Sequence, residues 1–175
     1  MNTPAPVEQR HYMTPGGHRR LRDELEYLVK MERPKIVEIV SWAASNGDRS
    51  ENGDYLYGKK RLREIDRRIR FLMKRLENAH VIDPGLQQHR EQVFFGATVV
   101  VCDEEGAEST YSIVGIDEAD PHKGWISWVS PLAKALLKLR EGDVARFASP
   151  LGNRELEILE VIYQTLDMPV FNPDA

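Results

Sequence analysis

The chain has 175 residues, a formal net charge of −4 and a single cysteine, Cys102. This length suits one ordinary domain or two small ones, and one cysteine excludes an internal disulfide and any metal-binding cysteine spacing. Because there is no apolar run long enough to cross a membrane and no signal-peptide pattern, we expect a protein of the reduced cytoplasm with no membrane partner.

The net charge conceals a difference between the two halves of the chain. Residues 1–85 carry 17 Lys and Arg against 13 Asp and Glu, whereas residues 86–175 carry 7 against 15. The halves therefore have opposite net charges, which predicts that they meet different partners.

The first half predicts two long helices. Thr14 and Pro15 form a typical helix start, in which Thr14 caps the helix and Pro15 occupies its first turn. Pro34 interrupts this helix and predicts a kink or the loss of one backbone hydrogen bond. Apolar residues recur along it at helical spacing: Leu21, Leu25, Leu28, Ile36, Ile39 or Val40, and Ala43.

The second helix has a cleaner pattern, with apolar residues spaced 3, 4, 3 and 4, as in a coiled-coil seam. The connection between the helices, residues 46–53, is short, so the two arms should be antiparallel neighbours, each roughly 40 Å long. We predict a flexible extension over residues 1–13, a hairpin over 14–82 and its tip at 46–54. The seam residues of the second arm are Leu62, Ile65, Ile69, Leu72 and Leu76.

After Asp83-Pro84-Gly85 the pattern changes to short strands, which predicts a small antiparallel sheet domain over residues 86–166. Ser130 and Pro131 predict the start of one helix, with the serine as its cap. Residues 167–175 read as a flexible tail. The chain is therefore expected to be α+β, a helical hairpin followed by a sheet domain. The strands are expected near 93–101, 110–114, 125–129, 144–147 and 156–163.

Two acidic residues, Asp48 and Glu51, lie in the connection between the helices. A pair of carboxylates at the closed end of a hairpin is well placed to supply oxygen ligands to the active site of another protein. Two structural interpretations compete with this one. Asp48 or Ser50 could cap the second helix, with Glu51 completing a capping-box spacing, and acidic loop residues are often simply solvated.

A calcium-binding loop is a third alternative for this segment. Asp48, Ser50, Asn52 and Gly53 fit positions 1, 3, 5 and 6 of an EF-hand loop. Position 12 requires a bidentate glutamate, but Lys59 stands there. An ammonium group removes two oxygen ligands and repels the ion, so the sequence argues against this site.

The residues after the tip are strongly basic, with nine Lys and Arg against Glu64 and Asp66 between residues 59 and 75. A mixed-charge solvated face is the structural alternative, but the excess of one sign favours a path for a polyanion. Two carboxylates hold Mg²⁺ only weakly, so a partner would have to complete the site. The combination suggests metal-assisted chemistry on nucleic acid.

These residues resemble the bacterial Gre transcript-cleavage factors, and within that family the GreB group. The resemblance covers about residues 13–165, nearly the whole chain. One departure is Gly53, which stands where the family usually has alanine. The matching motifs are Trp42-Ala43-Ala44-Ser45, Gly47-Asp48-Arg49-Ser50-Glu51-Asn52, Asp54-Tyr55, residues 59–68, Val93-Phe94-Phe95-Gly96-Ala97, Ile113-Val114-Gly115 and Ser130-Pro131-Leu132-Ala133.

The resemblance implies an N-terminal antiparallel coiled coil and a C-terminal domain of the FKBP type. It implies a monomer that is not itself an enzyme, whose coiled coil enters the secondary channel of RNA polymerase and stimulates cleavage of backtracked nascent RNA. Asp48 and Glu51 would help to hold a second Mg²⁺ there. Ser130 and Pro131 match a segment that docks on the polymerase. Candidate RNA contacts are Lys59 and Lys60 and, less directly, Arg61, Arg63, Arg67 and Arg68.

Two other functions remain open from the sequence. A factor of this shape could occupy the channel and regulate the polymerase without cleavage, although the acid pair argues against it. The C-terminal domain could alternatively be a prolyl isomerase or chaperone, for which fold resemblance is weak support. The residues of its peptide pocket would be Tyr111, Trp125, Trp128 and Phe147, which at strand spacing are more typical of core or sheet surface.

Overall fold

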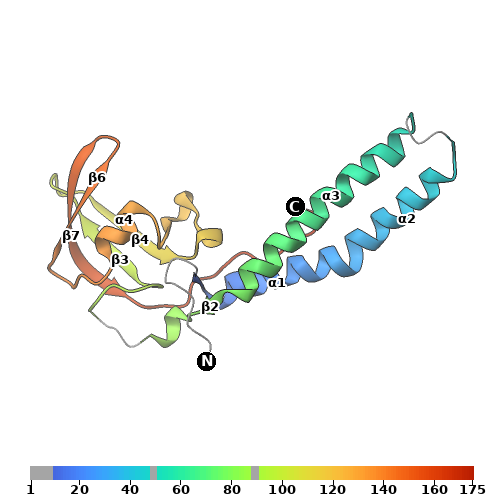
Figure 1. The fold of residues 1–175 in the computed structure, drawn as a ribbon. Coiled ribbons are helices and arrows are strands. Elements are labelled where there is room, and N and C mark those ends of the chain that lie inside the picture. The colour runs from blue at the N-terminus through green and yellow to red at the C-terminus, as the bar shows by residue number, and fades with distance from the viewer. Residues whose placement is uncertain (1–9, 48–50, 88–90) are drawn as a thin grey trace, which may run out of the picture. The chain divides into compact units, whose positions relative to one another are not determined.

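The computed structural model describes residues 10–47, 51–87 and 91–175, which form two compact units. A sheet unit contains the described residues up to His18 together with Ala79–Pro169, and a hairpin unit contains Arg19–Asn78 with Val170–Ala175 (Figure 1). The predicted α+β class, a helical hairpin followed by a sheet domain, is confirmed. None of the helices described is both long and apolar enough to cross a membrane.

A small two-stranded sheet contains the start of the described chain. Strand β1 (His11–Met13) pairs in parallel with β2 (Ala79–Val81). The prediction of a flexible segment over all of residues 1–13 was therefore wrong for its last three residues. Three residues are too few to show the alternation by which a strand is recognised in sequence.

A buried carboxylate fixes the first turn of helix α1 (Pro15–Tyr27). Thr14 caps the helix as predicted, since its Oγ1 accepts a hydrogen bond from Gly17 N (3.2 Å). Glu118 in turn accepts from Thr14 N (2.8 Å), Thr14 Oγ1 (2.6 Å) and Gly115 N (2.7 Å). Burial raises the pKa of Glu118, while these donors oppose the rise. Gly17 is required here because a Cβ would overlap the Glu118 carboxylate.

The main sheet has the order β5-β4-β3-β7-β6. Its pairs are antiparallel except for β4 with β5, so the prediction of a wholly antiparallel sheet was wrong for that edge. Between β4 and β5 the chain passes through short 3₁₀ turns at Ile116–Glu118 and Pro121–Lys123, which bring it back to start β5 in the same direction as β4. The strands are β3 (Thr98–Cys102), β4 (Glu108–Val114), β5 (Trp125–Ser127), β6 (Val144–Ser149) and β7 (Gly152–Ile162).

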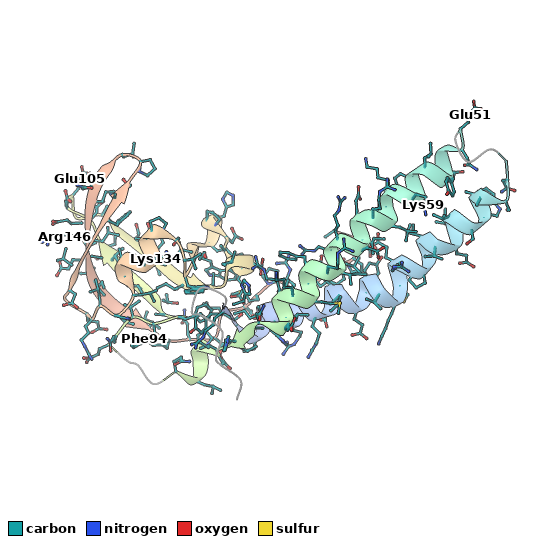
Figure 2. All side chains as sticks on the ribbon, viewed as in Figure 1. Glu51, Lys59, Phe94, Glu105, Lys134 and Arg146 are labelled. Carbon is teal, nitrogen blue, oxygen red and sulfur yellow. The ribbon has the colours of Figure 1, made fainter. Side chains whose placement is uncertain are left out.

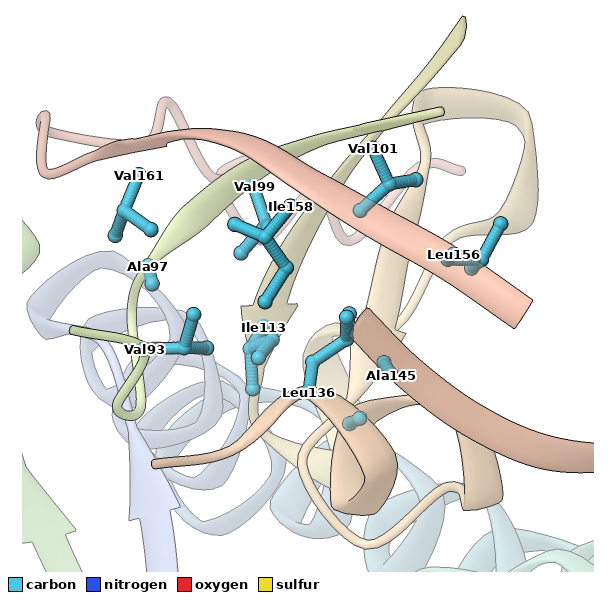
Figure 3. Packing of buried hydrophobic residues seen from close by; sticks show 11 residues of the cluster. Val93, Ala97, Val99, Val101, Ile113, Leu136, Ala145, Leu156, Ile158 and Val161 are labelled. Atoms are coloured by element: carbon cyan, nitrogen blue, oxygen red, sulfur yellow. The ribbon is translucent and has the colours of Figure 1, made fainter. Parts of the chain in front are cut away.

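The core of the sheet unit lies between the sheet and helix α4 (Pro131–Leu136) (Figure 3). Alternate residues of the central strands point inward, as a period of two requires. Val99 and Val101 of β3 are fully buried, and so are Ile113 of β4 and Leu136 of α4. Ser130 caps α4 as predicted, because its Oγ accepts from Ala133 N (3.2 Å).

The first arm of the hairpin is divided by a π-helical segment, Leu28–Glu32, which separates α1 from α2 (Arg33–Ala44). The backbone N–H of Arg33 bonds to the carbonyl of Leu28, five residues earlier. Proline lacks an N–H, and in an α-helix its ring clashes with the carbonyl four residues before. The wider π turn just before Pro34 accommodates that ring, so the predicted interruption is confirmed in this form.

The second arm is a single helix, α3 (Gly53–Glu77), which packs along the first arm (Figure 1). The predicted seam is present, although it is buried to different degrees. Ile65 and Leu72 of α3 are 1% and 0% exposed, and Ala43 of α2 is 0% exposed. Leu62, Ile69 and Leu76 are half-buried.

The last residues of the chain contact the hairpin. Val170–Ala175 belongs to the hairpin unit, and the ring of Phe171 lies 5.5 Å from that of Tyr27, centroid to centroid. Phe171 also lines a groove of about 330 Å³ with residues of both arms, among them Leu28 and Ile65. The prediction of a flexible tail over 167–175 therefore needs correction for Phe171, whose ring covers apolar surface beside the π segment. Its sequence has no periodicity that indicates such a contact.

The two arms of the hairpin approach each other closely at Gly58. It is buried in α3, and a Cβ at this position would lie 2.5 Å from Val40 Cγ2. Alanine normally stabilises a helix by about 1 kcal/mol relative to glycine. Valine is stiff at χ1, so overpacking should outweigh this gain and Gly58→Ala should lower the free energy of unfolding by about 1–3 kcal/mol. Thermal unfolding followed by helical circular dichroism measures the change.

Gly53→Ala is the matched control, because a Cβ at this first helical residue would have no neighbour within 4 Å among the described residues. It should raise the melting temperature or leave it unchanged. If Gly58→Ala is as stable as Gly53→Ala, the two arms are not in close contact at Val40.

Candidate functional site

The tip of the hairpin is held by one side chain that joins both helix ends. Asn52 Oδ1 accepts a hydrogen bond from Tyr55 N (3.2 Å) and caps α3, while its Nδ2 donates to the carbonyl of Ala43 near the end of α2 (2.7 Å). The structural alternative in which Asp48 or Ser50 caps the helix is therefore excluded. The helix begins at Gly53, so only Asn52 has the N-cap position, and asparagine is among the best residues there.

Glu51 lies at the closed end of the hairpin, between α2 and α3 (Figure 2). Its side chain is exposed, and among the described residues it has no hydrogen-bond or ion-pair partner. The second predicted acid, Asp48, lies outside the described residues. The Glu51 carboxylate is therefore open to a ligand from outside the chain, and no arginine of the hairpin neutralises it in the part that the structure describes.

A shallow hollow surrounds this carboxylate. It is lined by Trp42 and Asn46 from the end of the first arm and by Glu51, Asn52 and Asp54 from the start of the second. Trp42 is 61% exposed, although Ala43 beside it is fully buried. Sequence reasoning missed Trp42 and Asn52 as site residues. A large aromatic residue off the apolar stripe of its helix was the signal for Trp42.

Carboxylate oxygens of this kind are the ligands that Mg²⁺ prefers. No group of three or more acidic, histidine or cysteine residues that could hold a metal occurs among the described residues. Glu51 can supply one or two of the six oxygens that Mg²⁺ requires, and Asp48 is three residues away in sequence. The Glu51 carboxylate thus has the chemistry of a Mg²⁺ ligand, but the described residues do not by themselves make a complete magnesium site.

The basic residues of α3 other than Arg75 separate into two groups. Lys59, Lys60, Arg63 and Arg67 are exposed and form no ion pair with any described residue. At 100° per residue these four side chains lie on the face opposite the Ile65–Leu72 seam, and so do two more exposed cations. We call this set the outer basic face; its members are Lys59, Lys60, Arg63, Arg67, Arg70 and Lys74.

The second group faces the first arm and is neutralised there. Arg61 Nε donates to Glu32 Oε1 (2.8 Å), and its Nη1 lies 3.2 Å from Glu64 Oε2. Arg68 makes two bonds to Glu24, of 3.0 Å and 2.8 Å. Of the six candidate RNA-binding residues, Arg61 and Arg68 are therefore engaged in ion pairs inside the hairpin unit, while the other four are open.

The remaining predicted residues lie in the sheet unit. The Ser130 hydroxyl is used as the helix cap, whereas Pro131 is exposed in the first turn of α4. Of the aromatic residues considered for a peptide pocket, Tyr111, Trp128 and Phe147 pack against the core cluster. The fourth, Trp125, has the Lys123 ammonium 4.6 Å from its ring centroid. These contacts account for the aromatic residues as parts of the sheet unit.

Two family models match the chain. The model described as "Transcription elongation factor, N-terminal" matches residues 11–81, and the one described as "Transcription elongation factor, GreA/GreB, C-term" matches residues 87–163. The chain belongs to the GreA/GreB family of transcription elongation factors. The N-terminal model spans the whole hairpin from α1 to α3, and the C-terminal model ends after β7, before Val170–Ala175.

Several curated relatives named transcription elongation factor GreB are similar over most of this family member. The relative from Neisseria meningitidis serogroup B is 59% identical over 161 residues, which is 92% of this chain and 99% of the relative. The relative from Yersinia pestis is 48% identical, covering 90% of this chain and 91% of its own. Among solved structures, GreA factor homolog 1 of Thermus thermophilus is 25% identical with a TM-score of 0.40, covering 87% and 98% of the two chains.

The Asn52 bridge gives a direct test of how the tip is held in this Gre family member. Asn52→Ala removes both hydrogen bonds, so it should cost about 1 kcal/mol and loosen the first turn of α3. Hydrogen exchange at the Tyr55 amide should become faster, while that of Leu72 in the middle of α3 stays slow.

Asn52→Asp is the matched variant, because it keeps the acceptor for Tyr55 N and removes only the donor to Ala43. It should retain most of the protection at Tyr55. Equal protection of Tyr55 in wild type and Asn52→Ala would contradict the capping role.

Proposed function

We propose that this protein inserts its hairpin into the secondary channel of RNA polymerase and stimulates cleavage of backtracked nascent RNA, which rescues arrested complexes. The observation that carries the proposal is the exposed Glu51 carboxylate at the closed end of the hairpin, which has no partner among the residues that the structure describes. Membership in a family of transcription elongation factors supports RNA polymerase as the partner. Such a partner works in the bacterial cytoplasm.

The proposal gives Glu51 and Asp48 the role of metal ligands contributed by the factor. Each would present a carboxylate oxygen to a Mg²⁺ ion shared with acidic residues of the polymerase. When bound between the two proteins, that ion would lower the pKa of a water molecule and neutralise charge on the RNA phosphate. Because the tip supplies only part of the ligand set, the protein has no cleavage activity by itself and acts as an activator, not as an enzyme.

The outer basic face has a separate role in the proposal. Lys59, Lys60, Arg63 and Arg67 would contact the phosphates of the RNA that has been extruded past the active centre. Arg61 and Arg68 are weaker candidates, since an RNA phosphate would first have to displace Glu32 or Glu24. The sheet unit, through Ser130 and Pro131, would dock a single copy of the protein at the rim of the channel.

The tip acids are tested by the double variant Asp48→Asn/Glu51→Gln, which removes both charges while keeping side-chain size. It should abolish stimulated cleavage in backtracked complexes, because neutral amides bind Mg²⁺ far more weakly than carboxylates do. Binding to polymerase should change little. Gel analysis of labelled RNA gives the cleavage rate, and competition with labelled wild-type factor gives the affinity.

Glu38→Ala, at an exposed acid along α2, is the control and should cleave like wild type. If the double variant still stimulates cleavage fully, the metal-ligand role is wrong. If wild type binds polymerase and slows it without releasing RNA fragments, the protein is instead a non-cleaving channel regulator.

The outer basic face is tested by Lys59→Ala/Lys60→Ala/Arg63→Ala. Each single-strand phosphate that the factor no longer neutralises should reduce the slope of log affinity against log salt by about 0.7, so three such phosphates should reduce it by about 2. The measurement is the factor concentration that half-saturates cleavage, taken at several salt concentrations.

Arg61→Ala is the informative comparison, because its guanidinium is bound by Glu32 and Glu64. It should leave the salt slope near the wild-type value and lower only the stability of the hairpin. If Arg61→Ala changes the salt slope more than the triple variant does, RNA binds the ion-paired arginines and not the outer basic face.

A further inference from the structure

The π segment Leu28–Glu32 is the point at which the first arm of the hairpin can bend. The backbone N–H of Arg33 reaches back five residues to Leu28 instead of four, and Pro34, which follows, has no N–H to donate. Sharp bends of helices occur at π turns and at prolines, and here the two stand side by side. A bend of the first arm would therefore be centred here.

A small bend at the π segment has a large effect at the tip of the hairpin. Helix α2 continues for 12 residues beyond the π segment, which is about 18 Å of helix. A bend of about 5° would therefore move the end of α2, with Glu51 beyond it, by about 1.5 Å. Misplacement of a reacting group by about 1 Å can slow a reaction about 100-fold. Delivery of Glu51 to a reacting centre thus requires the π segment to be held in place.

The C-terminal end of the chain lies at this point of the hairpin. The ring of Phe171 is 5.5 Å, centroid to centroid, from that of Tyr27, the residue just before the π segment. The groove that Phe171 lines also contains Leu28 and Glu32, the first and last residues of the π segment. Its opposite wall is α3, at Ile65 and three charged neighbours, and the C-terminus lies beside that helix (Figure 1). Phe171 thus belongs to a groove between the π segment and α3.

The sequence stiffens the segment that carries this ring. Pro169 lies two residues before Phe171 and Pro173 two residues after it. Proline fixes its own φ and restricts the residue before it to extended conformations. Docking therefore costs less conformational entropy than it would for a flexible tail. The start of the segment is also in contact with the protein, because a Cβ at Gly16 in the first turn of α1 would lie 2.8 Å from Met168 Cβ.

We propose that residues 168–173 form a strap that holds the π segment against α3, and that Phe171 is a positioning residue that keeps Glu51 in place through this contact. The effect on cleavage rests on the proposed function, whereas the effect on the hairpin does not. The strap lies beyond residue 163, where the match to the C-terminal family model ends. Its anchor on the hairpin is one half-buried ring, so removal of that ring should release it.

Phe171→Ala is tested first on the free protein by hydrogen exchange. The Arg33 amide should exchange about 10-fold faster, because burial of the ring no longer opposes opening of the π turn. The Tyr55 amide at the tip should exchange as in wild type. Phe171→Tyr keeps the ring, and Val170→Ala changes a neighbour that is 76% exposed, so both should protect Arg33 like wild type. Equal exchange of Arg33 in wild type and Phe171→Ala overturns the strap.

Cleavage of backtracked RNA gives the second measurement. With Phe171→Ala the maximal rate at saturating factor should fall about 10- to 100-fold, because the tip is displaced. The factor concentration that half-saturates cleavage should stay the same, since the sheet unit is unchanged. A contact that only stabilises the fold would leave the maximal rate unchanged well below the melting temperature, and that result overturns the positioning role. A higher rate or a lower half-saturating concentration also overturns it, because the strap would then obstruct the hairpin. If wild type gives no cleavage, the proposed function fails, while hydrogen exchange still decides the strap.

Discussion

Burial of one apolar stripe from each arm against the other is the constraint on which the hairpin depends. Ala43 of the first arm and Ile65 and Leu72 of α3 are almost completely buried, and Gly58 lets the arms approach closely at Val40. This contact fixes the rotation of α3 about its own axis. Every other side chain of that helix then has a defined direction, including the cations on which the proposed function relies.

The sorting of charges follows from that rotation. Arg61 and Arg68 point along the first arm, where Glu32 and Glu24 bind them, whereas the six cations of the outer basic face form no ion pair with any described residue. A surface ion pair contributes little to stability, on the order of 0–1 kcal/mol. The ion pairs of Arg61 and Arg68 therefore matter chiefly for where positive charge is found. They neutralise it beside the first arm, so the unpaired positive charge lies on the outer basic face.

Much of this organisation could be predicted from the sequence, and the reasons differ between features. The seam of α3 could be predicted because its 3-4 spacing is regular. Thr14 and Ser130 could be predicted as helix caps because each precedes a proline. The strand β1 and the contact of Phe171 with Tyr27 were not, since short pairings and aperiodic segments depend on residues distant in sequence. The parallel edge between β4 and β5 depends on the path of a loop.

At the tip, the position of Glu51 was predictable from the motif, but the part played by its neighbours was not. Asn52 could not be distinguished from Asp48 or Ser50 as a cap without knowing where α3 begins. Two ion-paired arginines were grouped with four open cations because charge counts carry no information on pairing. Trp42 was passed over because it does not belong to the apolar stripe, which is also the reason it is exposed.

The π segment of the first arm has a consequence for the phase of its apolar stripe. Leu21, Leu28, Ile36 and Ala43 are separated by seven, eight and seven residues. An eighth residue in a seven-residue repeat would, in a regular α-helix, turn everything beyond it away from the partner helix. The π turn over Leu28–Glu32 contains one residue more than an α-helical turn and so compensates for the extra residue in the spacing. Leu28 and Ala43 can therefore both face α3.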